Sequence, residues 1–410
     1  MSFDLTNLQR IPGFKVLVER DAECHMRDNT ILRSDIYRPD EDGSYPVLLI
    51  RGPYDKRVGL STFGNSHPAW FAEHGYIVII QDTRGRFASE GEFYPFAYEA
   101  EDGFDSVEWA ARVTGSDGQV GMFGFSYLGA TQLLAATTRP PSLKAIVPGF
   151  TASQYFDGWT YNSGAFALGF NCYWANLLAM DTAARNKNIS ALEELSLSLG
   201  SASNWFWSTP LKNYPPLKNK SADYFFDWLA HPTYDEYWRQ WSIDDDYSRI
   251  DVPALHIAGW YDIFLSGSVN NFCGISRDGG SANTRNHQKL LIGPWTHMPW
   301  SPVGNTGKTE PSTSEIDDWT IRWFDEILKN KNTGILDSPI TIYPVNGNLL
   351  ELKTWPTGES PKETWFFHSE GRANSKFGDG KLDKYSPADE HVDLFVSNPT
   401  IPIQSNGGHS

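Results

Sequence analysis

The sequence QVGMFGFSYLGATQLLAA, residues 119–136, passes from a short apolar run into a helix-like segment through the hexapeptide Gly124-Phe125-Ser126-Tyr127-Leu128-Gly129. A serine on a sharp strand-to-helix turn, with glycines that relieve crowding, is typical of a nucleophile elbow. Such a turn holds the hydroxyl clear of its own backbone and directs the helix N-terminus at developing negative charge. Serine is also a common helix N-cap, so the hexapeptide alone leaves both interpretations open.

Apolar, strand-like runs alternate with helix-like segments on both sides of this turn. The pattern predicts strands at 46–50, 76–80, 119–123, 143–147, 253–258 and 289–292, and helices at 68–74, 99–111, 130–136 and 315–329. Strands that are apolar throughout and separated by helices indicate a parallel sheet covered on both faces. We therefore expect an α/β core made of residues 1–150 and 249–335.

Two other segments break this alternation. Residues 151–248 are rich in tryptophan, contain no comparable apolar strand, and are expected to form a helical cap, with helices over 181–199 and 221–241. Residues 336–410 carry short strand-like runs at 339–345 and 363–367 between Gly, Pro and Asn turns, which predicts a small all-β module.

The composition excludes several classes of partner. The formal charge is −16, from 34 basic and 50 acidic side chains, and no basic run is present, which argues against nucleic acid and anionic membranes. The three cysteines have neither zinc-site spacing nor the pattern of a disulfide framework. The first residues do not resemble a secretory signal, and no apolar run reaches membrane-spanning length, so a cytoplasmic protein is expected.

A serine nucleophile needs a base and an acid that orients the base. In an α/β-hydrolase the chain order is serine, acid, histidine, and the acid and the histidine follow strands of the sheet. Of ten histidines, only His297 follows a predicted strand of the α/β core downstream of Ser126, whereas His256 lies inside a strand and is expected to be a packed core residue.

Asp262 follows the strand at 253–258 in the position that the acid requires. Asp82 also follows a strand, but it precedes the elbow, so a buried structural role beside Arg84 or Arg86 is expected for it. Ser126, Asp262 and His297 thus agree in residue type, order and placement, which favours a serine hydrolase over an ordinary helix cap. This chemistry requires neither a metal nor an organic cofactor.

The oxyanion of the reaction needs two hydrogen-bond donors. The backbone N–H of Tyr127, directly after the nucleophile, is the expected first donor. The loop after the first core strand, Arg51-Gly52-Pro53-Tyr54, has no Gly-Gly run, so the Tyr54 hydroxyl is a candidate for the second. A tyrosine that only occupies a turn explains the same residue equally well.

Six motifs together resemble one family. They are 51–56, 81–86, 89–93, 124–129, 259–262 and 293–297, in the right order over most of residues 15–330. The chain resembles the cocaine esterase / X-prolyl dipeptidyl aminopeptidase family of CocE/NonD-type α/β-hydrolases. The resemblance implies Ser126, Asp262 and His297 as the triad and Tyr54 and Tyr127 as the oxyanion hole. It also implies a helical cap and a C-terminal jelly roll.

Within the family the likeness is greatest to the cocaine esterase branch, in which two cap tryptophans and a phenylalanine line the acyl pocket. Trp159, Trp174 and Phe264 stand in corresponding places. The branch that binds an α-ammonium group carries carboxylates where this chain has Phe264 and Leu265, or near Asn162 and Ser163. The resemblance therefore disfavours substrates with a charged α-amine.

These observations predict an α/β-hydrolase core with an inserted helical cap and a partial jelly roll. The expected activity is hydrolysis of small carboxylic esters with an apolar or aromatic acyl group, by one chain or a homo-oligomer. The alternatives are an amidase, acylase or acyl-peptide hydrolase on the same triad, and an inactive or binding-only truncated hydrolase. The last arises because the chain stops where 401–403 and 407–408 would lead into the second half of the jelly roll.

Overall fold

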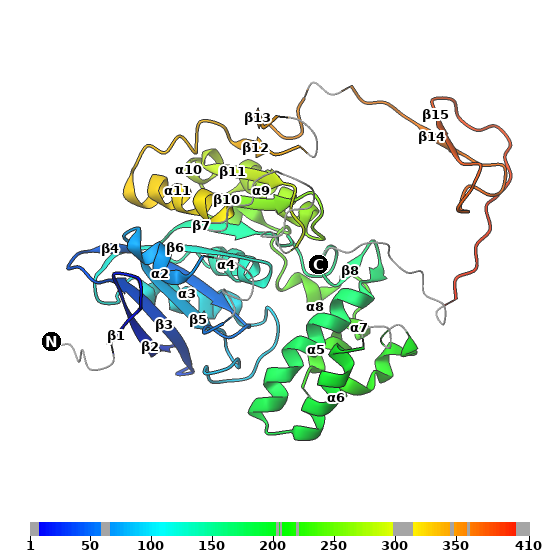
Figure 1. Ribbon diagram of the computed structural model, residues 1–410. Helices are drawn as coiled ribbons and strands as arrows, with labels where there is room; N and C mark the ends of the chain where they lie inside the picture. The colour runs from blue at the N-terminus through cyan, green and yellow to red at the C-terminus, as the bar shows by residue number, and fades with distance from the viewer. Residues whose placement is uncertain are drawn as a thin grey trace.

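The computed structural model describes residues 8–58, 66–201, 205, 207–218, 221–297, 315–344, 348–358 and 361–398. A single large sheet crosses the molecule, with strand order β1-β2-β3-β5-β4-β6-β7-β10-β11-β12-β13 (Figure 1). Its strands are β1 (Leu8–Arg10), β2 (Val16–His25), β3 (Ile31–Pro39), β4 (Tyr45–Gly52), β5 (Ile77–Asp82), β6 (Ser116–Phe125), β7 (Leu143–Gly149), β10 (Ala254–Gly259), β11 (Gln288–Gly293), β12 (Ile340–Ile342) and β13 (Leu350–Leu352).

The centre of the sheet is parallel, as the apolar strands predicted. Strands β5, β4, β6, β7, β10, β11 and β12 pair in parallel, whereas β1 to β3 and β13 add antiparallel edges. The antiparallel strands β2 and β3 lay outside the predicted set. Charged and polar residues interrupt both strands, at Glu19–Asp21 in β2 and at Arg33–Asp35 in β3, so they lack the continuous apolar run by which the central strands were found.

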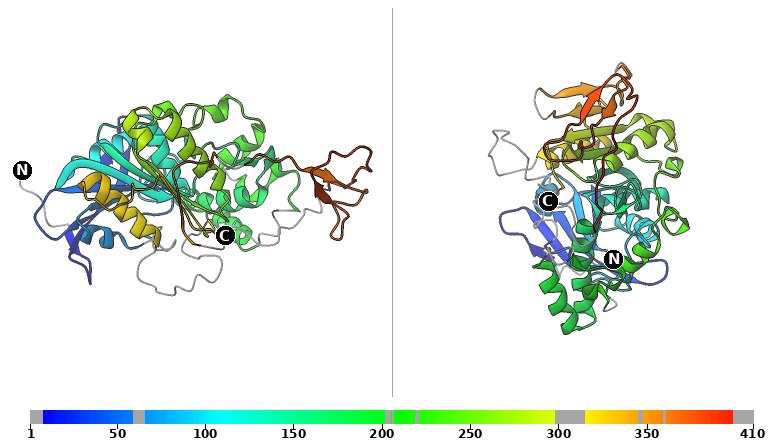
Figure 2. Two further views of the ribbon diagram at one scale, coloured as in Figure 1. Left: turned by 90° about the horizontal axis from the view of Figure 1, so that it is seen from above. Right: turned by 90° about the vertical axis from the view of Figure 1, so that its right-hand side faces the viewer.

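Helices cover both faces of the sheet (Figure 2). Alternate residues of β4 divide between two cores: Val47 and Leu49 face one, Leu48 and Ile50 the other. The first core contains α3 (Glu99–Ala110) and α4 (Tyr127–Thr137), and the second contains α2 (Pro68–Glu73) and α11 (Glu315–Lys329). The remaining core helices are α9 (Leu265–Asp278), which packs on β10 and β11, and α10 (Ala282–Asn286).

The cap is helical, as expected, but its helices differ from the predicted ones. It contains α5 (Leu168–Arg185), α6 (Ile189–Leu199), α7 (Asp223–Ala230), α8 (Glu236–Arg239), the 3₁₀ turns η3 (Leu211–Asn213), η4 (Pro215–Leu217) and η5 (Tyr247–Arg249), and the strands β8 (Tyr161–Asn162) and β9 (Ala165–Phe166). The prediction of one helix over 181–199 was wrong, because Lys187 has a φ of 54° and the Asn188 side chain caps a new helix. The predicted helix over 221–241 is two helices, interrupted at Pro232.

The C-terminal segment contributes to two sheets. Strand β12 pairs with β11 and β13 pairs with β12, so the run at 339–345 extends the core sheet instead of starting a separate module. This pairing satisfies the backbone groups along the outer edge of β11. A two-stranded sheet of β14 (Phe366–His368) and β15 (Lys381–Asp383) lies apart from the core in Figure 1. We propose that the β module starts after Leu352; residues 401–403 and 407–408 lie outside the described residues.

No helix in the part of the chain that the structure describes has the length and apolar character needed to cross a membrane.

His256 is a packed core residue, as predicted. It lies in β10, is fully buried, and its Nε2 is 2.9 Å from Oε1 of Gln288 on β11. Burial lowers the pKa of His256 from 6.5 to about 4. The folded protein therefore keeps this imidazole neutral over a pH range in which the unfolded chain binds a proton.

This difference predicts an acid-sensitive contribution to stability. The free energy of unfolding should fall as the pH drops from the unfolded pKa of 6.5 towards about 4, since only the unfolded state gains the proton in that window. His256→Gln keeps an N–H donor but cannot be charged. When the pH is lowered from about 7.5 to about 4.5, the free energy of unfolding, measured with urea, should fall by roughly 2–3 kcal/mol more for the wild type than for this variant. Equal losses in the two proteins would contradict the assignment.

Candidate active site

The structure places Ser126 on a strained turn between β6 and α4. Its φ of 60° and ψ of −126° are unusual for a residue with a side chain and cost of order 1–3 kcal/mol. Both glycines of the hexapeptide are needed sterically. A Cβ on Gly124, where φ is 136°, would lie 2.6 Å from Cβ of Leu128, and one on Gly129 would lie 2.8 Å from Cβ of Thr151. Ser126 occupies the N-cap position of α4, yet its hydroxyl makes no capping hydrogen bond.

The Ser126 hydroxyl is instead directed at a histidine. His297 Nε2 is 2.9 Å from Ser126 Oγ, and His297 Nδ1 is 2.8 Å from Oδ1 of Asp262. The Asp262 carboxylate is fully buried, and the His297 side chain is 15% exposed. Because the carboxylate accepts the Nδ1 proton, Nε2 is left as the acceptor for the serine hydroxyl. The three residues predicted from order and strand ends therefore lie in one hydrogen-bonded chain.

Hydrogen bonds between two loops hold the acid and the histidine together. Asp262 follows β10 and His297 follows β11, and these strands pair in parallel up to Gly259 and Gly293. Beyond the sheet, the N–H of Trp260 donates to the Gly293 carbonyl and that of Tyr261 to the Trp295 carbonyl. The Phe264 ring meets the His297 ring edge-on, with centroids 5.1 Å apart.

The two predicted oxyanion donors lie beside the serine. Tyr127 is the first residue of α4, so its N–H is one of the unpaired donors at a helix N-terminus. Tyr54 follows β4, and its hydroxyl accepts a hydrogen bond of 3.0 Å from the indole Nε1 of Trp174. Burial raises the pKa of Tyr54 to about 12, against the effect of hydrogen bonds with Trp174 and Ser126. The hydroxyl therefore keeps its proton at neutral pH and can donate it.

A buried charged network beneath the elbow was not foreseen from the sequence. The Tyr127 hydroxyl donates to Oε1 of Glu99 at 2.9 Å, and Oε2 of Glu99 lies 2.9 Å from NH1 of Arg51. The Tyr127 oxygen also accepts from the N–H of Phe96. Burial raises the pKa of Glu99, and the Arg51 guanidinium opposes that rise. An arginine at the end of an otherwise apolar strand was the signal in the sequence.

Asp82 has the predicted buried structural role but a different partner. Its Oδ1 accepts from the N–H of Lys56 at 2.7 Å, and its Oδ2 lies 3.2 Å from the Lys56 ammonium. Arg84 binds Asp28 and Asp102, and Arg86 faces Asp181, so the prediction of an Arg84 or Arg86 partner was wrong. Lys56 follows Tyr54 by two residues and so ties its loop to the end of β5.

The three predicted pocket residues form an aromatic cluster next to His297. Trp159 stacks on Phe264 with centroids 4.5 Å apart and meets Trp174 at 5.3 Å. Phe170, one turn before Trp174 on α5, joins them: it stacks on Trp174 at 5.9 Å and meets Phe264 edge-on at 5.7 Å. Phe170 was missed because α5 was not predicted to begin before residue 181, so no helical spacing linked it to Trp174.

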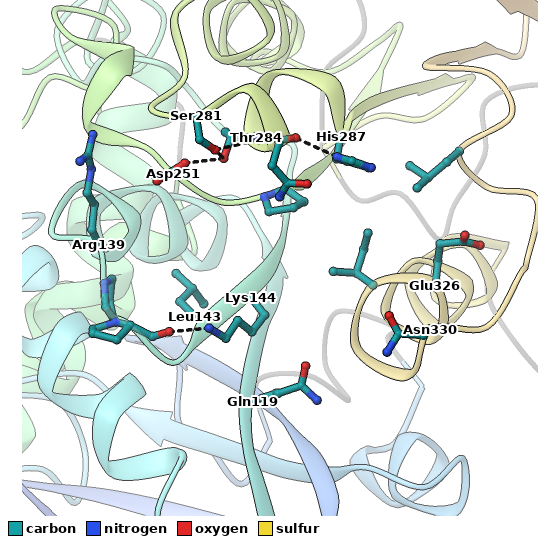
Figure 3. A pocket seen from close by; sticks show the side chains of 16 residues that line it. Gln119, Arg139, Leu143, Lys144, Asp251, Ser281, Thr284, His287, Glu326 and Asn330 are labelled. Carbon is teal, nitrogen blue, oxygen red and sulfur yellow. Dashed lines mark hydrogen bonds between the residues drawn. The ribbon is translucent and has the colours of Figure 1, made fainter.

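A surface cavity lies away from the triad. This cavity of about 670 Å³ opens at the edge of the sheet where β7, β10 and β11 begin, whereas Ser126 follows the end of β6. Figure 3 shows the side chains that line it. Several of its polar side chains form hydrogen bonds with neighbouring residues. Lys144 donates to the Pro141 carbonyl, and Thr284 donates to Asp251. Among the described residues, no group of three or more His, Cys, Asp or Glu side chains has the geometry of a metal site.

Comparisons with known proteins agree with this architecture. The family model described as X-Pro dipeptidyl-peptidase (S15 family) matches residues 28–299. A cocaine esterase from Rhodococcus sp. strain MB1 Bresler is 32% identical over 398 residues, which cover 93% of this chain and 68% of that protein.

Two solved structures share the fold. A CocE/NonD family hydrolase from Staphylococcus aureus has a TM-score of 0.62 at 21% identity, covering 86% of this chain and 58% of its own. An aminopeptidase from a marine sediment Thaumarchaeota archaeon has a TM-score of 0.70 at 21% identity, covering 98% and 69%. The chain thus spans about three-fifths to two-thirds of the length of these proteins.

The network beneath the elbow predicts a marked stability effect. Glu99→Leu removes the acceptor of the Tyr127 hydroxyl and leaves the buried Arg51 without a carboxylate. Breaking a buried ion pair on one side costs roughly 3–5 kcal/mol, which urea unfolding would measure. The double variant Arg51→Met/Glu99→Leu removes both charges and should be more stable than Glu99→Leu alone. If the double variant lost as much free energy of unfolding as Arg51→Met and Glu99→Leu lose together, the two charges would not be coupled.

Proposed function

This chain belongs to the X-Pro dipeptidyl-peptidase (S15) family, and on that premise we propose that it is a serine hydrolase that cleaves carboxylic esters with an apolar or aromatic acyl group. The observation that carries the proposal is the hydrogen-bonded chain from Ser126 through His297 to the buried Asp262. That chain lies at the end of the sheet where the parallel strands finish, which is where ligands bind in α/β folds.

The reaction follows from the positions of the side chains. His297 Nε2 takes the proton of Ser126 Oγ as the oxygen attacks the ester carbonyl, and Asp262 stabilises the imidazolium that forms. The Tyr54 hydroxyl and the Tyr127 N–H donate to the resulting oxyanion. His297 then gives its proton to the departing alcohol, leaving an acyl group on Ser126. Water, deprotonated by His297, releases the acid by the same route.

The aromatic cluster supports the choice of acyl group. Trp159, Trp174 and Phe264 are each at most 4% exposed and stack within reach of His297. The family resemblance implies that an ammonium-binding site would carry carboxylates where this chain has Phe264 and Leu265. A charged α-amine buried against these rings would lack a partner, and burying an unpaired charge costs several kcal/mol.

A second candidate is the hydrolysis of amides with an uncharged acyl group on the same triad. The match to a family of dipeptidyl-peptidases favours it, because peptide and ester cleavage share every step except the protonation of the leaving group.

Ser126→Ala should abolish ester turnover, because no other group replaces the attacking oxygen. The test is hydrolysis of 4-nitrophenyl benzoate, with circular dichroism to check that the variant is folded. A fluorophosphonate probe should label the wild type at Ser126 and leave the variant unlabelled. Turnover near the wild-type rate in the variant would refute the nucleophile, and an unlabelled wild type would favour a binding-only protein.

The acyl preference can be tested with a matched pair of substrates. 4-Nitrophenyl 3-phenylpropanoate and 4-nitrophenyl phenylalaninate differ only in the α-ammonium group. We expect kcat/KM to be about 100-fold higher for the uncharged ester, the equivalent of about 3 kcal/mol of uncompensated charge burial. The same two acyl groups as 4-nitroanilides compare amide with ester cleavage. A preference for the charged acyl group would contradict the proposed pocket, and faster anilide cleavage would favour the second candidate.

A further inference from the structure

We propose that Trp174 is a positioning residue for the oxyanion hole: its indole N–H fixes the Tyr54 oxygen so that the phenol proton points at the oxyanion. This inference rests on the proposed function. It assigns to the cap helix α5 a part in catalysis in addition to its part in the acyl pocket.

The direction of the hydrogen bond is set by chemistry. An indole nitrogen can only donate, so the Tyr54 oxygen is the acceptor in its 3.0 Å contact with Trp174 Nε1. The single phenol proton must therefore point to another group. Ser126 lies close enough to Tyr54 to affect its pKa, and the Ser126 proton faces His297 Nε2 at 2.9 Å. We place the phenol proton on the side of Ser126, beside which the oxyanion forms.

The same hydrogen bond strengthens the donor. When an oxygen accepts a hydrogen bond, its own O–H becomes more polarised, and the effect is larger where water is excluded. The bond from Trp174 is the first of the hydrogen bonds that lower the pKa of Tyr54 against the dominant effect of burial. A phenol that donates more strongly stabilises the oxyanion more than the neutral carbonyl of the substrate.

Arg86 holds both partners at the required distance. Its Nε donates to the carbonyl of Pro53, the residue before Tyr54, at 3.1 Å, and its NH1 donates to the carbonyl of Leu178 at 2.8 Å. Leu178 lies one turn after Trp174 on α5. Because this buried guanidinium binds the Tyr54 loop and the cap helix together, the contact between the two side chains is preorganised.

Stacking fixes the orientation of the indole. Trp228 lies parallel to Trp174, with centroids 5.7 Å apart and an interplanar angle of 4°, and Phe170 stacks on it at 5.9 Å. Trp174 is only 4% exposed, so its ring cannot turn without displacing these neighbours. Its N–H is thus held towards Tyr54 before substrate arrives.

Trp159 provides a matched control within the same cluster. It is a buried tryptophan that contacts Trp174 and Phe264, but its Nε1 has no hydrogen-bond partner among the described residues. Trp→Phe at either position changes the shape of the acyl pocket, whereas only the change at Trp174 removes a hydrogen bond to Tyr54.

The test is a double-mutant cycle with 4-nitrophenyl benzoate, with kcat expressed per fluorophosphonate-labelled serine so that only folded enzyme is counted. Tyr54→Phe should lower kcat by roughly 10²–10³-fold, as loss of an oxyanion donor does elsewhere. Trp174→Phe should lower kcat by about threefold to tenfold, the net effect of one hydrogen bond. In the Tyr54→Phe background, Trp174→Phe should lower kcat no further, because the group through which it acts is gone.

Trp159→Phe should act mainly on KM, and equally in both backgrounds. Replacing Trp174 alone with 3-benzothienylalanine removes the N–H while keeping the shape of the ring, and should reproduce the loss in kcat even if Trp174→Phe folds poorly. The inference is overturned if the loss at position 174 is the same with and without the Tyr54 hydroxyl, or appears only in KM. The proposed oxyanion hole, by contrast, is overturned if Tyr54→Phe itself leaves kcat unchanged.

Discussion

The parallel pairing of β10 with β11 is the constraint on which the site depends. The two strands are in register from Ala254 opposite Gln288 to Gly259 opposite Gly293, so both chains leave the sheet at the same level. Backbone hydrogen bonds then join the two loops that follow these strands, before the chain reaches Asp262 or His297. Asp262 and His297 therefore meet because of strand register, and β6 delivers Ser126 to the same edge.

Buried charges support the loops that carry the other functional groups. Lys56 and Asp82 fix the loop of Tyr54, and Arg51 and Glu99 hold the side chain of Tyr127 from below. Each pair lies where water is excluded, so the loss of one partner would leave an expensive unpaired group. These pairs are therefore best understood as devices that fix geometry, because an ion pair out of water contributes little net stability.

The cap is joined to the core by polar contacts as well as by aromatic packing. Arg86 binds a carbonyl of α5 and one next to Tyr54, and Trp174 reaches from α5 to the Tyr54 hydroxyl. The aromatic residues of the cap thus have two roles. They line the proposed acyl pocket, and one of them, Trp174, donates a hydrogen bond to the hydroxyl of Tyr54 in the proposed oxyanion hole. Exclusion of water strengthens every hydrogen bond inside the site.

The sequence by itself determined the parallel core strands, the elbow at Ser126, and the order of Ser126, Asp262 and His297. Each of these follows from local patterns: an apolar run, a glycine in a turn, or a residue directly after a strand. Only the tertiary structure decided that Asp82 pairs with Lys56, that β12 extends the core sheet, and that Trp174 binds Tyr54. Trp174 and Tyr54 are 120 residues apart, and no local pattern says which distant side chain will complete a buried polar group. That choice is made when the cap packs on the core, because the packing decides which buried donors and acceptors come within hydrogen-bond distance of one another.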